Sequence, residues 1–273
     1  MNKLKFLLGV AVCGAIFSAA VAQAGIQGYG TVIRSVGLAS YSLGDNQWHP
    51  LQAGKYLPVG ATIRTGHDGI VDIVLGKEVS MPQAAWQPQR ISFAPDAPVR
   101  GLINYKPAVE QNIIRVTPDS VVAIDKLTII DTGADTVSDT ELNLKQGKIY
   151  ASVKKLTGAS QYFIKLPNGI AGVRGTLFSI SADGTINCYE SKGGGVLLSL
   201  VGADGNATTY TVLPGQGFSL GDPAAALPAN VMSDLGSIFT SLCTSYFQAV
   251  DFSFDHTRTY VSPTQGWNGR RPL

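Results

Sequence analysis

Short runs of β-prone residues, most of them ended by glycine or a polar turn, constrain the fold of this chain more than any other feature. Val71, Ile73 and Leu75 alternate with other residues in the way that is typical of a half-buried strand. Further β-prone runs lie at residues 31–34, 38–43, 61–65, 113–116, 121–124, 149–153, 162–166, 173–180, 185–189, 196–200 and 209–213. This spacing predicts an all-β fold, either a sandwich or a flattened roll of many short strands.

One helix is predicted near the C-terminus, at about residues 230–248. Its apolar residues recur every three or four positions, at Val231, Leu235, Ile238, Leu242 and Tyr246. Asn230 is the predicted N-cap. We expect the helix to pack on the sheet and the chain from residue 251 onward to be extended.

Residues 79–110 differ in character from the strands around them. Five prolines fall in this span, and proline removes the donors that a central strand needs. We therefore predict an insertion with extended or loop structure, which acts either as a binding loop or as a surface flap. The predicted organisation is a β domain at residues 25–225 that contains this insertion, followed by a helix and tail at residues 226–273.

The first 24 residues have the features of a secretory signal peptide. Lys3 and Lys5 precede a run of small and apolar residues that ends in Ala22-Gln23-Ala24, an A-x-A cleavage site. The alternative is an uncleaved membrane anchor. Cleavage would remove two lysines and no acids, which leaves 19 basic and 19 acidic side chains. A neutral chain lacks the electrostatic footprint of a nucleic-acid-binding protein, and no later segment is apolar for long enough to span a membrane.

Two cysteines, Cys188 and Cys243, remain after the predicted cleavage. An even number of cysteines in an exported chain permits a disulfide. Free cysteine also behaves as a small buried hydrophobe, so two free thiols are the alternative.

Three glycine-containing motifs resemble those of a known family. The first is a hydrophobic-x-x-Gly-x-hydrophobic pattern at residues 144–149, the second is the sequence at residues 172–178, and the third is the turn Pro214-Gly215-Gln216. The opening pattern of the same family is also matched, by Trp48, Leu51, Gly54, Leu57, Gly60 and the turn at residues 63–69. Over roughly residues 30–220 the chain therefore resembles the FecR domain, an extracytoplasmic all-β module.

The resemblance implies a location in the bacterial periplasm or cell envelope and a mainly structural role for the motif residues. These are Gly147, Gly172, Val173, Arg174, Gly175, Thr176 and Gly215. We expect residues 172–176 to form one buried central strand. Within it, the Arg174 fork either bonds backbone carbonyls or a carboxylate across the sheet, or contacts a ligand or partner.

No motif for catalysis, for a cofactor or for a metal stands out. The three histidines are not at metal-ligand spacing, and neither a Cys-x-x-Cys nor a G-x-S-x-G motif occurs. An exported, non-enzymatic module that binds an envelope protein or polysaccharide is therefore the predicted function. An enzyme acting on cell-envelope carbohydrate is the alternative, and it would need two acidic side chains facing each other in a cleft.

Well-known members of the FecR family, which this chain resembles, are membrane-spanning regulators whose cytoplasmic part binds a sigma factor. Few residues precede the apolar segment here, so we expect the extracytoplasmic module without that part. A membrane-anchored signalling component is a further alternative.

Export predicts that the mature protein begins at Gly25, because the A-x-A site ends at Ala24. N-terminal sequencing of the protein recovered from the envelope fraction checks this. Envelope protein that still begins at Met1 would show that the apolar segment is retained as an anchor.

Overall fold

The computed structural model describes residues 25–77, 99–102, 106–107, 112–244, 247–248 and 251–254, except Asn46, Ala134 and Ala203. The predicted signal peptide, most of the predicted insertion and the end of the tail lie outside these residues. At 99–102, 106–107, 247–248 and 251–254 only the backbone is described. There β8 (Val99–Leu102) pairs with β23 (Asp251–Phe254), and β9 (Lys106–Pro107) pairs with β22 (Phe247–Gln248).

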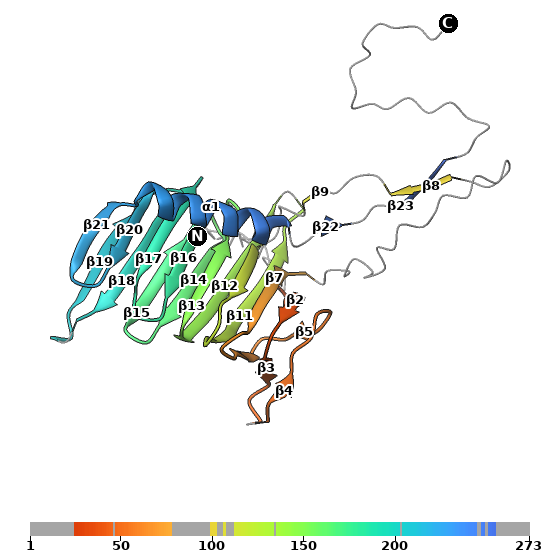
Figure 1. Cartoon of the computed structure of the whole chain (residues 1–273), viewed down its shortest axis with the longest axis horizontal. Coiled ribbons are helices and arrows are strands. Elements are labelled where there is room, and N and C mark those ends of the chain that lie inside the picture. Colours follow the sequence, from red (N-terminus) through yellow and green to blue (C-terminus); the bar gives the residue numbers. More distant parts are fainter. Residues whose placement is uncertain are drawn as a thin grey trace, which may run out of the picture.

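Two facing sheets make up the body of the protein (Figure 1). Sheet A contains ten strands: β1 (Ile26–Gln27), β3 (Ala39–Ser42), β4 (His49–Pro50), β6 (Thr62–Thr65), β11 (Val121–Asp131), β12 (Thr136–Gln146), β14 (Gln161–Leu166), β15 (Gly169–Val173), β18 (Val196–Val201) and β19 (Ala207–Val212). Their order is β19-β18-β15-β14-β12-β11-β6-β3-β4, and β1 pairs with β11.

Sheet B contains nine strands: β2 (Tyr29–Val36), β5 (Tyr56–Leu57), β7 (Ile70–Gly76), β10 (Asn112–Val116), β13 (Lys148–Ser152), β16 (Thr176–Ser181), β17 (Ile186–Ser191), β20 (Gln216–Ser219) and β21 (Asp222–Ala226). Their order is β21-β20-β17-β16-β13-β10-β7-β2-β5. The chain passes repeatedly from one sheet to the other, so neighbouring positions in the two sheets come from neighbouring stretches of sequence.

The core lies between the sheets and follows from period-2 alternation. In β12 the buried positions are Ser138, Thr140, Leu142 and Leu144, while the residues between them are half-buried. Sheet B supplies residues such as Phe178, which is fully buried, to the same apolar cluster. Burying one such side chain contributes about 1.5–3 kcal/mol, and many strands contribute several of them.

Helix α1 (Ala229–Thr244) covers the outer face of sheet B (Figure 1). Leu235, Phe239 and Leu242 pack there against residues of β2, β7 and β10 in a second, smaller apolar cluster. The prediction of an all-β fold with one C-terminal helix packed on it is therefore confirmed. The predicted N-cap is wrong, because the Pro228 carbonyl accepts the N–H of Met232 at 3.0 Å and Asn230 lies in the first turn.

A buried ion pair lies on the same outer face of sheet B. Asp72 is fully buried, and Arg115, its cross-strand partner on β10, is 8% exposed. The Arg115 guanidinium donates two hydrogen bonds to the Asp72 carboxylate, from Nε to Oδ1 at 2.6 Å and from Nη2 to Oδ2 at 2.7 Å. Arg34 of β2 approaches the same carboxylate at 3.7 Å, and Ser241 Oγ of α1 lies 3.4 Å from the guanidinium. These contacts thus link the adjacent strands β2, β7 and β10 to α1.

Breaking this pair should destabilise the protein strongly, because it leaves a buried guanidinium without its counter-charge. We expect Asp72→Asn to lower the free energy of unfolding by about 3–5 kcal/mol, as measured by urea denaturation. The matched control is Asp131→Asn. Its carboxylate is 54% exposed and pairs with Lys77, so the loss should stay below about 1 kcal/mol. Equal losses in the two variants would contradict this account.

Candidate functional site

The first family motif lies at a crossing between the sheets. Gly147 joins β12 of sheet A to β13 of sheet B and has a φ of +78°, a region that glycine enters without steric penalty. A Cβ on Gly147 would lie 2.1 Å from Ser120 Oγ. Ser120 belongs to the preceding crossing, from β10 to β11, and its Oγ accepts the N–H of Lys148 at 3.0 Å. Gly147 therefore allows two successive crossings to lie directly against each other.

The second motif does not form the single buried strand that we predicted. Val173 ends β15 in sheet A and Thr176 begins β16 in sheet B, and the chain bends between the sheets at Arg174 and Gly175. Gly175 has a φ of +65°, and a Cβ there would lie 2.9 Å from the Lys155 Cα. Apolar alternation continues in sequence across the bend, and this concealed the break.

Arg174 lies on the surface at this bend, outside any buried central strand. Its Nη2 donates to the carbonyls of Thr157 and Gly158 at 3.1 and 3.2 Å. The fork therefore bonds backbone carbonyls, but those of a neighbouring loop rather than of a strand across the sheet. Gly172 lies in β15, where a Cβ would be 3.4 Å from the Phe163 ring.

The third motif is a tight turn before β20. Gly215 has a φ of +75°, donates its N–H to the Cys188 carbonyl at 2.8 Å and accepts the N–H of Leu227 at 2.8 Å. This turn therefore ties β17 to the segment that leads into α1.

Cys188 and Cys243 are free thiols. Cys188 lies in the core between the sheets, where burial raises the pKa of its thiol to about 11. Cys243 is on α1, where its Sγ lies 3.7 Å from Ser152 Oγ on the outer face of sheet B. Sheet B therefore lies between the two sulfur atoms in this structure.

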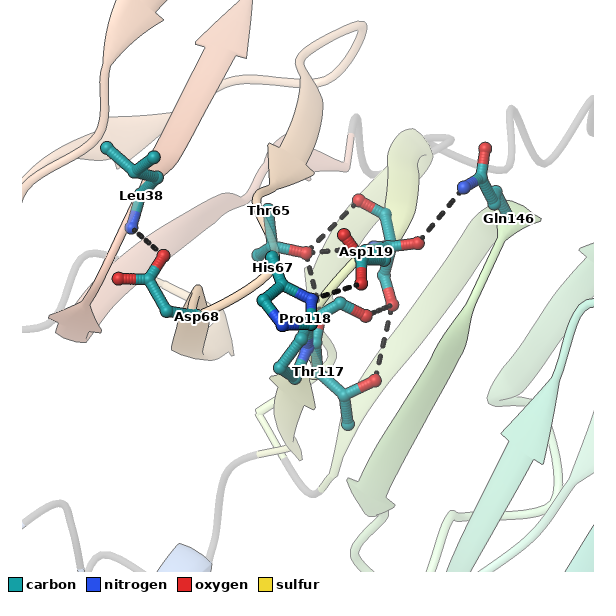
Figure 2. Close-up of polar contacts among 9 residues, drawn as sticks. Leu38, Thr65, His67, Asp68, Thr117, Pro118, Asp119 and Gln146 are labelled. Carbon is teal, nitrogen blue, oxygen red and sulfur yellow. Dashed lines mark hydrogen bonds and ion pairs between the residues drawn. The ribbon is translucent and has the colours of Figure 1, made fainter.

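A network of polar side chains surrounds the crossing from β10 to β11 (Figure 2). The Thr65 hydroxyl donates to the Thr117 carbonyl at 2.6 Å and accepts the N–H of Ser120 at 2.9 Å. His67 Nδ1 lies 3.3 Å from Asp119 Oδ2, but these side chains are 98% and 61% exposed. Exposed pairs of this kind contribute at most about 1 kcal/mol. The threonine and serine hydroxyls of this network are hydrogen-bonded to backbone groups, so the network stabilises the crossing. None of these hydroxyls is placed as an activated nucleophile.

A cleft of about 220 Å³ opens between the sheets at one end of the sandwich. It exists because β11 and β12 are 11 residues long whereas β10 and β13 have only 5, so the sheet A hairpin extends beyond sheet B. Its walls are formed by Leu75, Gly76, Lys77, Asn112, Leu127, Ile129, Thr136, Ser138, Thr140 and Lys154.

The cleft contains polar side chains at positions where the rest of the interior is apolar. Ser138 and Thr140 point inward from β12, are 8% and 0% exposed, and have hydroxyls without a hydrogen-bond partner. Tyr162, the register partner of Thr140, does not line the cleft, but its hydroxyl is also unpartnered, and burial raises the pKa of that hydroxyl. Hydroxyls left unpaired in an interior are costly, which makes them candidates for ligand contacts.

Two lysines and an asparagine complete the cleft. Asn112 is 3% exposed, and its Oδ1 accepts the backbone N–H of Lys154 at 3.0 Å. Lys77 Nζ lies 3.1 Å from Asp131 Oδ2, and this hydrogen bond lowers the pKa of Asp131 below its ordinary value. Sequence reasoning missed this site. The only available signal was the replacement of apolar residues by serine and threonine at the inward positions of β12.

Carboxylates gather elsewhere, on the outer face of sheet A. Asp139 lies 2.5 Å from Lys126, while Asp125 and Glu141 both pair with Lys165. Each lysine has its pKa raised, mainly by the hydrogen bond to its acidic partner. Across the described part of the chain, no three His, Cys, Asp or Glu side chains are placed to hold a metal ion. No described helix has both the length and the apolar character that crossing a membrane requires.

A matched pair of glycines tests the close contact at the first motif. Gly147→Ala should lose about 1–2 kcal/mol from the left-handed backbone and a further 1–3 kcal/mol from overlap with Ser120. Gly133→Ala is the control, since its φ is +81° but nothing lies within 4 Å of its Cβ. Denaturant unfolding of both variants measures the difference. A Gly147→Ala variant as stable as Gly133→Ala would show that the crossings are not in contact.

Comparison with known proteins supports the motif assignment. Residues 108–192 match the family described as FecR protein, and this segment includes Gly147, the residues 172–176 and most of the described cleft residues. No curated protein matches the chain. The match at residues 108–192 confirms the resemblance for the first two glycine motifs, whereas the turn at Gly215 and the opening at residues 48–69 lie outside the matched segment.

Proposed function

We propose that this protein is an exported, non-enzymatic FecR-domain module that binds a small ligand, or one end of a larger one, in the cleft between its sheets. In this proposal residues 1–24 are the export signal, residues 25–225 form the binding domain, and residues 226–273 supply the covering helix and the tail. The ligand comes from the periplasm or cell envelope.

The unpartnered hydroxyls of Ser138 and Thr140 carry the proposal. Binding sites are concave and mostly apolar, with a few polar groups that orient the ligand. Leu75, Leu127 and Ile129 form the apolar surface, and the hydroxyls supply unused hydrogen bonds.

Charge in the cleft indicates the kind of ligand. Lys77 and Lys154 line the wall, and no acidic residue is among the described lining residues, although Lys77 also pairs with Asp131. The chemistry fits a ligand with a short apolar body and an anionic end, such as an alkyl phosphate. The absence of carboxylates from the described lining supports a binding role over hydrolysis of carbohydrate, for which an acidic pair is needed.

Two threonine variants test this function. Thr140→Val removes a buried, unpartnered hydroxyl while keeping the shape, so it should raise the free energy of unfolding by about 1 kcal/mol and weaken hexyl phosphate binding roughly 2–10-fold. Thr31→Val is the control, because the Thr31 hydroxyl is also buried and unpartnered but does not line the cleft. It should stabilise the protein similarly and leave binding unchanged.

Calorimetric titration of the purified protein gives the affinities, and urea unfolding gives the stabilities. Binding of hexyl phosphate should weaken with added salt and exceed that of the neutral hexyl glucoside, because the lysines attract the phosphate. Absence of hexyl phosphate binding at millimolar concentration, or equal binding by Thr140→Val and the parent, would overturn the assignment of the cleft.

A further inference from the structure

Most sheet edges among the described strands are poorly suited to pair with another strand. At one end of the sandwich, β4 and β5 have only two residues each, and β4 ends in Pro50. At the other end, the sheet B edge β21 contains Pro223 and pairs with β20 through an irregular register. Short strands, prolines and bulges are the devices by which proteins block edge-to-edge pairing.

The sheet A edge strand β19 has none of these devices. All six of its residues, Ala207–Val212, pair with β18 without a register shift. The strand contains no charged residue and no proline, and Thr208, Thr209 and Thr211 are exposed. Figure 1 places β19 at the end of the body away from β3 and β4, where no other described strand follows it in sheet A. Its outer edge is therefore an open template for a further strand.

The surface beside β19 is also suited to contact. Three large apolar residues are exposed there on the outer face of β15 and β18: Ile170 at 37%, Leu197 at 51% and Val201 at 52%. Ser199 Oγ and Thr209 Oγ1 of the same face lie 2.8 Å apart. The charged groups of this face, including Lys165 and Glu141, begin one strand further on, at β14 and β12.

We propose that β19 pairs antiparallel with β19 of a second copy of this chain, which joins two A sheets into one continuous sheet. An uncharged strand has no like charges to bring together when it meets itself, and antiparallel pairing is compatible with a two-fold axis. Because the other described edges are blunted, pairing closes at a dimer instead of continuing into a filament. This inference does not depend on a ligand in the cleft.

A register centred on Thr209 fits the side chains. It places Thr209 opposite its own copy and Ala207 opposite Thr211. The hydroxyl pair Ser199–Thr209 would then continue across the axis, and threonine pairs of this kind stabilise antiparallel sheets. A six-residue strand and its flanking side chains bury less than the roughly 800 Å² per partner of a stable interface, so we expect a weak dimer with a dissociation constant above about 1 μM.

Sedimentation of the purified protein over a concentration series tests the dimer. The parent should change from monomer to dimer between about 1 μM and 1 mM, in keeping with its small interface. Thr209→Lys should remain monomeric at the highest concentration while its melting temperature stays near that of the parent. Ser233→Lys is the control, since it adds the same charge on the exposed side of α1 and should dimerise like the parent.

Cysteine cross-linking tests the register. In a Cys243→Ser background, Thr209→Cys should form an intermolecular disulfide under mild oxidation, because the two Cβ atoms would face each other at about 4.5–5.5 Å. Thr211→Cys faces Ala207 of the other copy in the same register and should cross-link far less. A protein that is monomeric at every concentration, a dimer that survives Thr209→Lys, or equal cross-linking by the two cysteine variants would each overturn the proposal.

Discussion

The contact between Gly147 and Ser120 is the constraint on which the rest of this structure depends. The chain crosses repeatedly between the two sheets, so successive crossings must fit against one another. Glycine in a left-handed conformation lets two crossings touch, and Ser120 Oγ then accepts the N–H of Lys148 at 3.0 Å and lies 3.1 Å from the Pro118 carbonyl oxygen of its own crossing. A side chain at Gly147 would force the crossings apart and open the core between β12 and β13.

The cleft follows from the same architecture. Where both sheets extend equally, leucine and isoleucine fill the interior, as Leu142 and Leu144 do in β12. Toward the end of sheet B the inward positions of the same strand become Ser138 and Thr140, which line the cleft together with Leu75 and Asn112. The polar change therefore occurs at the point where the opposing sheet stops. A binding site at this end needs no change to the rest of the fold.

Local sequence patterns predicted most of the strands, the helix and the family motifs. Hydrophobic alternation and the positions of glycine can both be recognised from residues that are neighbours in the sequence. Features that depend on distant residues were not predictable. The pairing of Asp72 with Arg115 joins positions 43 residues apart, and nothing near either residue indicates its partner. The prediction for residues 172–176 failed for the opposite reason. Their local pattern is that of one strand, whereas Gly175 adopts a left-handed conformation close against Lys155 of another segment. Ser138 and Thr140 lie in β12, a strand that is absent from the predicted β runs, and only the structure shows that they line a cleft with Leu75 and Asn112.

The position of α1 has a consequence for how the molecule is made. The outer face of sheet B carries Ile33, Val74 and Ile113, and α1, which begins at Ala229, is the element that packs over them. Synthesis proceeds from the N-terminus, so the whole sandwich is complete before its cover emerges. Until then three apolar side chains and the Asp72–Arg115 pair face water on a surface that invites association with other chains. A chain that stops before Ala229 would keep that surface exposed, so the segment from Ala229 onward decides whether the finished sandwich stays separate from its neighbours.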